Sequence, residues 1–466
     1  MRASQPQVTI VGGGLAGLAA AAALSSAGVK ARVFERRRQL GGRAGSFWDT
    51  TAEQWVDHCQ HVSMGCCVNY ADFCRRTGTD HRFRRHPTVR FIGPDGRTST
   101  LRASHLPAPL HLAPALWSMK FLTPRERLMV MSALKRLALS ESGPPPDTTI
   151  GQWLAAHGQS ENVIRRFWGV VLVSALSETI EHSSFAAARK VFVDGFMAEP
   201  SGHVLEIPTV PLQELYDQIA HRLSEQGVAI QTEAHVRRVY CDTPHSTGIE
   251  LDGGRTIDCD AVIVAVPWRR LADLLSIEQL AAVPNGAALR DLPSAPISSM
   301  HLWFDRPAIP VEHAVLIDRL SQWVFRRPPP ASGPTLAREH CQVVISASRN
   351  LAARSREEVL EEVLRDIRGT WPESRGAQLL QWRLITQQDA VLSPRPEVAE
   401  LRPTQATAIS NLFLAGDWTR TGWPSTMEGA VRSGYLAAER VLDSLGSPAS
   451  FVQPEPRTWL TRRMLS

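Results

Sequence analysis

Three glycines near the start of the chain, and a glutamate after them, have the types and spacing of a dinucleotide-binding site. Gly12, Gly14 and Gly17 follow an apolar run that begins at Val8, and Glu35 lies 18 residues beyond Gly17. In this pattern the first glycine makes a tight turn, the second admits a pyrophosphate against the backbone, and the third lets a helix pack on a strand. The glutamate accepts hydrogen bonds from ribose hydroxyls and repels a 2′-phosphate, which favours NAD or FAD over NADP.

The glycine loop needs a strand, a helix and a second strand to hold it. Residues 8–11 form an apolar run, the alanine-rich segment after the loop reaches Ser26, and residues 31–34 form a second run. We therefore expect a strand, a helix and a strand, with Leu15 and Ala16 at the positive helix end that faces the phosphates. A glycine-rich turn in an ordinary α/β protein is the alternative, and the acid at this distance makes it the minority interpretation.

A second glycine pair, Gly41 and Gly42, precedes Arg43 just after the second predicted strand. With the first loop and the acid, this doublet resembles the flavin amine oxidase and phytoene desaturase superfamily, in which the three motifs together hold FAD. A further pair of glycines allows another close backbone approach, and an arginine offsets phosphate charge. The resemblance also assigns Arg36 to the FAD site; the alternative for Arg43 is a loop arginine in a basic stretch.

A second signature lies near the other end of the chain. A predicted strand, residues 411–415, runs into Gly416 and Asp417, and a helix is expected to begin near Thr426 and Met427. Asp417 is placed to accept from ribityl hydroxyls or to hold backbone near the pyrophosphate; its alternative is a helix-capping carboxylate. The resemblance implies that the helix end faces the flavin pyrimidine ring, where its dipole stabilises the negative charge of reduced flavin.

The composition describes an ordinary globular protein without a nucleic-acid motif. The 466 residues suffice for two or three domains, and a net charge of +5 from scattered arginines is compatible with an anionic membrane surface or with no such partner. Seven irregularly spaced cysteines indicate reduced thiols, the N-terminus does not read as a signal peptide, and no apolar run reaches 18 residues. We expect a cytoplasmic protein whose membrane contact, if any, is peripheral at the inner face of the cell membrane.

The alternation of strands and helices predicts an α/β fold with two domains. One is a Rossmann-like, discontinuous FAD-binding domain of the GR2 type, to which Val236 also contributes. It is assigned residues 1–65, 208–268 and 405–445. The other is a mixed α+β substrate domain, which is assigned residues 66–207 and 269–404. Residues 446–466 form a C-terminal tail.

Several local patterns bear on these domains. Thr123 and Glu126 form a capping box that predicts a helix to about Leu139. A helix is also expected over residues 161–177, and Gly253–Gly254 suits a hairpin. Residues 106–122 are apolar and broken by prolines, which fits either a buried loop and helix or a monotopic patch where a lipid enters. The tail from Trp459 is basic and partly apolar; a frayed terminus is the first expectation and membrane contact the alternative.

Residues 51–78 resemble a narrower family, the hydroxysqualene dehydroxylases, which are squalene-associated, desaturase-like flavoproteins of hopanoid pathways. Four residues of the family segment are kept: Asp57, Gln60, His61 and Val62. His58 and Cys59 stand where the family usually has asparagine and glycine. Shorter matches at residues 106–112, 208–212 and 301–305 extend the resemblance over most of the chain.

The resemblance implies a reaction on a C30 isoprenoid. Hydroxysqualene, an allylic alcohol, would receive a hydride from N5 of reduced flavin while its hydroxyl leaves as water, which yields squalene. Loss of the hydroxyl needs a proton donor, and an allylic cation needs a dry, apolar pocket. By the same resemblance Gln60 and His61 are the catalytic candidates, with cofactor positioning as their alternative role. An external electron donor and contact with prenyltransferase-like enzymes of the squalene pathway are the implied partners.

Other functions stay open on the same motifs. Carotenoid desaturation uses the same flavin and apolar tunnel in the reverse direction, whereas amine oxidation is disfavoured by four tyrosines and the lack of cysteine in residues 423–426. A non-catalytic flavin-containing isoprenoid carrier or partner subunit is a further alternative. His301 is read as a core histidine. No metal is predicted, because no zinc-site spacing fits His58, Cys59, His61, Cys66 and Cys67.

Overall fold

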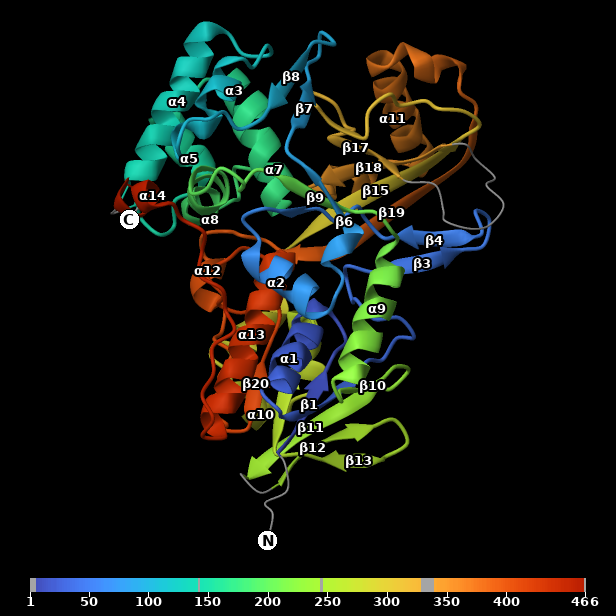
Figure 1. Ribbon diagram of the computed structural model, residues 1–466, viewed down its shortest axis with the longest axis vertical. Coiled ribbons are helices and arrows are strands. Elements are labelled where there is room, and N and C mark those ends of the chain that lie inside the picture. Colours follow the sequence, from blue (N-terminus) through green and yellow to red (C-terminus); the bar gives the residue numbers. More distant parts are fainter. Residues whose placement is uncertain (1–5, 141–142, 244–245, 328–338, 465–466) are drawn as a thin grey trace.

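The computed structural model describes residues 6–140, 143–243, 246–327 and 339–464. Its lower half in Figure 1 is built on a five-stranded parallel sheet with the order β10-β2-β1-β14-β20. These strands are Ala229–Gln231, Lys30–Phe34, Gln7–Val11, Ala261–Val264 and Leu412–Leu414 in that order. Three separate stretches of the chain therefore interleave in one sheet, as a discontinuous Rossmann-like fold requires, and the α/β prediction is confirmed.

Helices cover this sheet because their small residues allow close approach. α1 (Leu15–Ser26) is buried along nearly its whole length, and α13 (Met427–Ser444) crosses it. A Cβ on Gly434 of α13 would lie 2.2 Å from the Ala16 carbonyl oxygen, so this crossing depends on glycine. α9 (Leu212–Glu225) and α2 (Val68–Arg76) complete the surrounding core.

Two smaller sheets adjoin the lower half. β11 (Val236–Thr243), β12 (Ser246–Leu251) and β13 (Thr256–Asp258) form an antiparallel meander, and the predicted hairpin at Gly253–Gly254 joins the last two. β3 (Ser46–Asp49) pairs with β4 (Gln54–Asp57). This second hairpin leads the chain from the glycine doublet towards the segment that contains Gln60 and His61.

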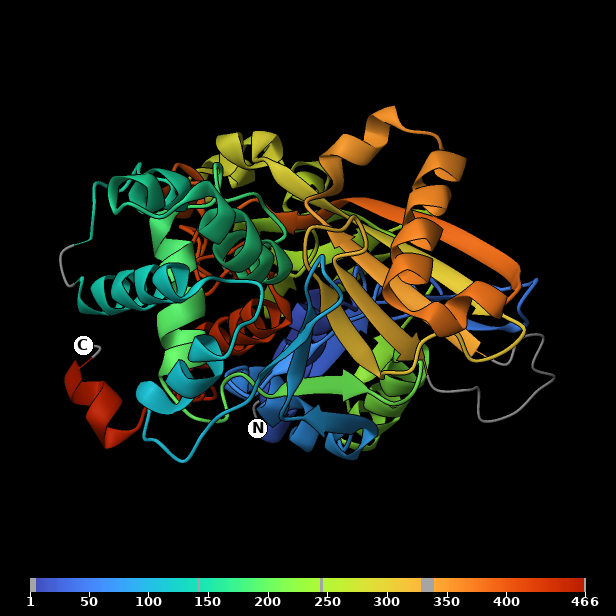
Figure 2. The same cartoon turned by 90° about the horizontal axis from the view of Figure 1, so that it is seen from above.

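The upper half contains a seven-stranded, mainly antiparallel sheet with the order β19-β15-β18-β17-β16-β7-β8. Its strands are Leu379–Leu392, Ser294–Phe304, Glu339–Ser346, Trp323–Arg327, His313–Leu316, Val89–Ile92 and Thr98–Leu101. A small sheet of β5 (Ser63–Met64), β9 (Leu205–Pro208) and β6 (Phe83–His86) lies below it. Seen from above, the large sheet lies on one side and a group of helices on the other (Figure 2).

The helical group packs around a core that it shares with strands β7, β8 and β16 of the large sheet. Its members are α3 (Ala113–Trp117), α4 (Pro124–Leu139), α5 (Ile150–Ala156), α6 (Glu161–Val163), α7 (Val170–Leu176) and α8 (Phe185–Arg189). The remaining helices are α10 (Ile277–Ala281), α11 (Arg356–Thr370), α12 (Val398–Leu401) and α14 (Trp459–Met464). α4 begins at the capping box formed by Thr123 and Glu126, as predicted.

The structure differs from the expectations in three places. The helix expected over residues 161–177 contains a π-helical turn, Ile164–Gly169, and a second π-helical segment, Lys190–Met197, follows α8. The expected fraying of the tail is wrong, because α14 packs through a hydrogen bond of 2.9 Å from the Thr461 hydroxyl to the Ala198 carbonyl. Residues 106–122 are divided, with Leu112 buried and Trp117 exposed.

Candidate FAD site and substrate cavity

The first glycine loop has the close contacts that its spacing predicts. Gly12 has φ +112°, and a Cβ there would lie 2.5 Å from the Ala265 carbonyl oxygen at the end of β14. A Cβ on Gly17 would lie 2.0 Å from the Gly12 carbonyl oxygen, so only glycine lets α1 pack against the strand here. At Gly14 the nearest atom would be the Gly42 Cα at 4.0 Å. The backbone at Gly14 is therefore open on the side where a phosphate would approach.

Glu35 ends β2 and holds the glycine loop in place. Its carboxylate accepts hydrogen bonds from the backbone N–H of Gly13 at 2.8 Å and of Arg37 at 2.9 Å. The side chain is 7% exposed and lines the cavity described below. A carboxylate oxygen accepts more than one hydrogen bond, so capacity remains for the ribose contact, which stays a prediction.

The glycine doublet is joined to the first loop. The backbone N–H of Gly41 donates to the Gly13 carbonyl at 2.9 Å, and Gly14 and Gly41 form an isolated β-bridge. A Cβ on Gly41 would lie 2.3 Å from the Tyr216 ring of α9. The two motifs, separate in the sequence, thus make one backbone cradle at the N-terminus of α1.

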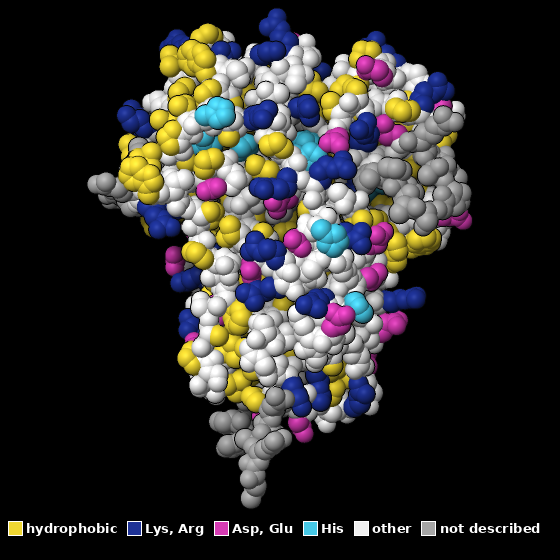
Figure 3. All heavy atoms as spheres, in the orientation of Figure 1, with side chains coloured by type: hydrophobic (Ala, Val, Ile, Leu, Met, Phe, Trp, Pro, Cys, Tyr) yellow, Lys and Arg dark blue, Asp and Glu magenta, His cyan; other side chains and the backbone are white. Residues whose placement is uncertain are grey.

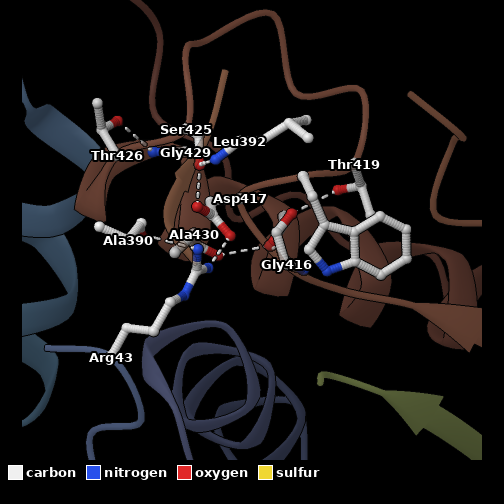
Figure 4. A network of polar contacts seen from close by, with 12 residues as sticks. Arg43, Ala390, Leu392, Gly416, Asp417, Thr419, Ser425, Thr426, Gly429 and Ala430 are labelled. Carbon is white, nitrogen blue, oxygen red and sulfur yellow. Dashed lines mark hydrogen bonds and ion pairs between the residues drawn. The ribbon is translucent and has the colours of Figure 1, made fainter. Parts of the chain in front are cut away.

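Arg43 connects the two ends of the chain through Asp417 (Figure 4). The Arg43 guanidinium forms an ion pair with one Asp417 carboxylate oxygen and donates to the Ala390 carbonyl at 3.0 Å. The Ser425 hydroxyl donates to the other carboxylate oxygen and itself accepts from the Leu392 backbone N–H at 3.1 Å. Both oxygens of Asp417 thus have protein partners, which supports the interpretation that Asp417 holds local structure.

The loop that leads to α13 is held by a partly buried arginine that the sequence did not reveal. Arg402 donates to the backbone carbonyls of Asp417 at 2.8 Å and Trp423 at 2.7 Å. Burial lowers the pKa of the Arg402 guanidinium to about 10. No motif marks this residue, because one arginine among many carries no spacing signal.

α13 begins where the second signature predicts. Thr426 is its N-cap and accepts from the Gly429 backbone N–H at 3.1 Å, and Met427 is its first residue. Glu428 turns back to α2 and accepts from the backbone N–H of Asn69 at 3.2 Å and of Tyr70 at 2.8 Å. Burial raises the pKa of the Glu428 carboxyl. The N-termini of α2 and α13 therefore meet beside the cavity.

A cavity of about 540 Å³ extends from the glycine loops into the upper half of the molecule. Nearly all the residues predicted to bind the cofactor line it: Gly12, Gly14, Leu15, Ala16, Glu35, Arg36, Gly41, Gly42, Arg43, Val236, Gly416, Asp417, Thr426 and Met427. Gly17 does not appear in its wall and instead packs beneath the loop. The structure thus brings together residues from four separate stretches, and their contacts with FAD stay predictions.

The other part of the cavity, which we call the substrate side, is lined by α7, the π-helical segment Lys190–Met197 and strands β15, β17 and β18. Its wall is mostly apolar and includes Val170, Val171, Val191, Phe196, Ile297, Trp323, Phe325 and Val344. The rings of Trp323 and Phe325 are nearly parallel, with centroids 5.4 Å apart. The Trp323 indole N–H donates to the Ser174 hydroxyl at 2.8 Å, which fixes this aromatic pair against α7.

Gln60 lines the cavity, and protein groups hold both its side-chain oxygen and its side-chain nitrogen. Its side-chain carbonyl accepts from the Arg327 guanidinium, and its amide nitrogen donates to the His61 carbonyl at 3.2 Å. Arg327 also pairs with Asp57 at 2.7 Å, and these two side chains are 8% and 1% exposed. Gln60 is therefore held in a fixed orientation by a buried ion pair.

His61 also lines the cavity, and its hydrogen bond determines what it offers there. Its Nδ1 lies 2.9 Å from the Cys59 carbonyl oxygen, so the neutral ring carries its proton on Nδ1 and keeps a lone pair on Nε2. Burial lowers the pKa of His61 below its usual value. At neutral pH this side chain accepts a hydrogen bond through Nε2 and has no spare proton.

The other histidines and the cysteine considered in this region pack against protein groups. Cys59 does not adopt the left-handed backbone conformation that would favour glycine at this position. Burial together with the Asp57 charge raises the pKa of its thiol to about 12. The His58 ring stacks on Phe47. His301 is buried, with Nδ1 3.0 Å from the Nε2 of His340, as a core histidine is expected to be.

The comparisons with known proteins agree with this geometry. A family model for flavin-containing amine oxidoreductases matches residues 15–442. The chain belongs to this family. Within it, the chain is 28% identical to the hydroxysqualene dehydroxylase of Sinorhizobium fredii, over 93% of this chain and 98% of that protein. It is 25% identical to the 15-cis-phytoene desaturase of Synechococcus elongatus, over 94% of this chain and 96% of that protein.

A solved structure of the same fold is an oxidoreductase from Methanosarcina mazei, with a TM-score of 0.68, 18% identity, and coverage of 94% of this chain and all of that chain. As a member of the family that the family model defines, this chain is an FAD-dependent oxidoreductase of the α/β class. The open backbone at Gly14 and the uncapped N-terminus of α1 fit the pyrophosphate of FAD. Among the described helices none is long and apolar enough to cross a membrane.

Proposed function

We propose that this enzyme reduces hydroxysqualene to squalene. The observation that carries the proposal is the apolar substrate side of the cavity, which continues directly from the predicted flavin site. The similarity to a hydroxysqualene dehydroxylase over 93% of the chain supports the same substrate class. FAD, when bound and reduced, supplies the hydride for the allylic carbon.

The residues that line the rest of the cavity exclude water, bind the isoprenoid chain and orient its hydroxyl. The apolar wall and the Trp323–Phe325 pair exclude water, which protects an allylic cation from hydration. A long isoprenoid chain is bound through burial of its apolar surface, worth about 25 cal/mol per Å². His61 offers a lone pair to the substrate hydroxyl and orients it, whereas departure of that hydroxyl needs a proton from another group.

Desaturation of a hydrocarbon isoprenoid is the second candidate. The same apolar cavity suits a polyene, and the similarity to a phytoene desaturase spans a comparable share of the chain. Amine oxidation is a weaker candidate, because an apolar wall does not select an amine. A non-catalytic carrier role is also weaker, because a carrier would not need an intact cofactor cradle. The direction of hydride transfer separates the first two candidates.

The substrate is a lipid, so we also propose a peripheral contact with the cytoplasmic face of the membrane. Large exposed apolar side chains gather on and beside α3, α4 and α14; they are Leu106, Leu110, Trp117, Leu128, Leu139 and Trp459. Figure 3 shows hydrophobic and basic side chains intermixed at the upper left, where Figure 1 has these helices. Mixed apolar and basic side chains favour an anionic bilayer surface. Flotation with anionic vesicles, compared between the protein and a Trp117→Ser, Trp459→Ser variant, tests this contact.

An anaerobic single turnover tests the reaction. Photoreduced holoprotein is mixed with hydroxysqualene in detergent, and flavin reoxidation is followed while the lipid product is extracted. Reoxidation with an equal amount of squalene is the expected result. Intact flavin that is not reoxidised contradicts dehydroxylation, and the oxidised enzyme is then mixed with phytoene, where flavin reduction identifies a desaturase. The reduced state is maintained in the cell by an external electron donor, with prenyltransferase-like enzymes as the source of substrate.

A further inference from the structure

We propose that Lys190 binds the hydroxyl of the substrate and protonates it as it leaves. The inference rests on the proposed dehydroxylation and supplies the proton donor that this reaction needs. Lys190 begins the π-helical segment Lys190–Met197 and lines the cavity. π-Helical turns in proteins occur frequently at functional sites, because they turn a side chain out of the regular helical register.

Lys190 lies next to the predicted flavin end of the cavity. Its ammonium nitrogen is 5.1 Å from the centroid of the Trp423 ring, and Trp423 also lines the cavity. Trp423 precedes Thr426, the N-cap of α13, by three residues. The cation is therefore located where the apolar substrate side meets the helix end assigned to the flavin.

Two carboxylates form ion pairs with the Lys190 ammonium. Nζ pairs with the Asp194 carboxylate at 3.2 Å and with Glu455 of the C-terminal tail. Glu455 also accepts from the Trp423 indole N–H at 3.1 Å, and Arg457 pairs with the other oxygen of Asp194. An ammonium has three N–H bonds, and the described residues supply no third polar partner for this one. One N–H thus remains available to a hydroxyl in the cavity.

Three other polar side chains on or near the substrate side, those of Ser174, His61 and Gln60, are poor proton donors. Among the described residues that line the substrate side of the cavity, Lys190 is the one with a cationic side chain. Ser174 uses its hydroxyl proton for the Val170 carbonyl at 2.7 Å. His61 has no spare proton, and the Gln60 amide is engaged at both ends. An ammonium in an apolar wall also interacts strongly with developing hydroxide, because little water screens the charge.

The step balances as follows. The Lys190 ammonium gives its proton to the hydroxyl oxygen, the carbon–oxygen bond breaks with its electron pair on oxygen, and water leaves. A hydride from reduced FAD would form the new C–H bond at the allylic carbon. One alcohol and one reduced flavin thus yield squalene, water and oxidised flavin. The neutral amine regains its proton from solvent past Glu455, whose side chain is 25% exposed. The external electron donor then restores the reduced flavin.

The test compares Lys190→Met with Arg457→Met. Both substitutions break an ion pair with Asp194, but Arg457 does not line the cavity and so controls for a loosened tail. We expect both variants to retain flavin absorbance and a similar Tm. We expect flavin reoxidation by hydroxysqualene to slow by about 100-fold or more in Lys190→Met alone, the usual range for loss of a proton donor. Lys190→Arg, which keeps the charge but gives up its proton far less readily, should bind substrate yet remain slow.

Chemical rescue and binding provide the second measurement. Ethylamine should restore reoxidation in Lys190→Ala in a saturable way, and should not accelerate Arg457→Met. In the oxidised holoprotein, perturbation of the flavin spectrum should show hydroxysqualene binding more tightly than squalene, and Lys190→Met should lose that preference. A Lys190→Met variant within about threefold of the wild-type rate overturns the role of Lys190 alone. Wild-type enzyme that hydroxysqualene does not reoxidise overturns the proposed reaction and this inference together.

Discussion

The predicted flavin side and the substrate side of the cavity are made in different ways. The flavin side is backbone: glycines at Gly12, Gly14 and Gly41 bring main chain close to where a phosphate binds. The substrate side is formed by side chains, with an apolar wall and a few fixed polar groups such as Ser174. A backbone site tolerates almost no added atoms, whereas a side-chain site changes its properties with each substitution. This difference allows one cofactor cradle to serve many reactions.

The largest effect should come from adding a methyl group to the glycine loop. Gly17→Ala places a Cβ 2.0 Å from the Gly12 carbonyl, so α1 must move away from its strand and the free energy of unfolding should fall by about 3 kcal/mol. Gly14→Ala meets no protein atom closer than 4.0 Å and should fold normally while losing FAD. Thermal unfolding and flavin absorbance measure the two effects. Equal Tm losses in both variants would contradict this distinction.

The next effect concerns the buried pair behind Gln60. Arg327→Met leaves the Asp57 carboxylate buried, with the Leu212 N–H and the Ser46 hydroxyl as its remaining partners among the described residues, which should cost about 3 kcal/mol of stability. Urea unfolding measures this, with the exposed neighbour Arg326→Met as the matched control. Flavin loading should change little, because neither side chain of the pair lines the cavity. A larger loss of FAD than of stability would place Arg327 in the cofactor site instead.

A pH dependence of stability should arise from two histidines buried in the upper sheet. Burial lowers the pKa of His301 to about 3 and of His313 to about 4, so both stay neutral in the folded protein where the unfolded chain takes up protons. Stability should therefore be constant above about pH 6.5 and fall below it, by up to about 1.4 kcal/mol per histidine and pH unit. His301→Gln should reduce that slope between pH 6 and 4, whereas the exposed His105→Gln should leave it unchanged.

The smallest effect is expected at Asp417. Asp417→Ala removes the partner of Arg43 and Ser425, but Arg43 is partly exposed and water replaces some of the lost interaction. We expect FAD to bind about tenfold more weakly, equivalent to about 1.4 kcal/mol. Flavin titration of the apoprotein measures this, and Asp417→Asn should lose less because it keeps the Ser425 contact. Unchanged FAD affinity in Asp417→Ala would remove this residue from the site.

The two sides also differ in how well the sequence predicts them. Glycine spacing, the capping box at Thr123 and the hairpin at Gly253–Gly254 are local rules, and the structure confirms these elements. The ion pairs of Arg43 with Asp417 and of Arg327 with Asp57 join residues 374 and 270 positions apart, and no periodicity records such contacts. The π-helical turns were missed because no residue type or spacing in the sequence marks a switch from i→i+4 to i→i+5 hydrogen bonds.

The link between Arg43 and Asp417 has a consequence for how the protein is made. The first glycine loop leaves the ribosome early, but its cradle lacks β20, the 416–426 loop and α13 until nearly the whole chain has been synthesised. α1 meanwhile has no partner for the surface that later packs on Gly434. The cradle therefore cannot enclose FAD before α13 has been made, and we expect a truncation before Met427, which removes α13, to lose the cofactor however intact its first motif.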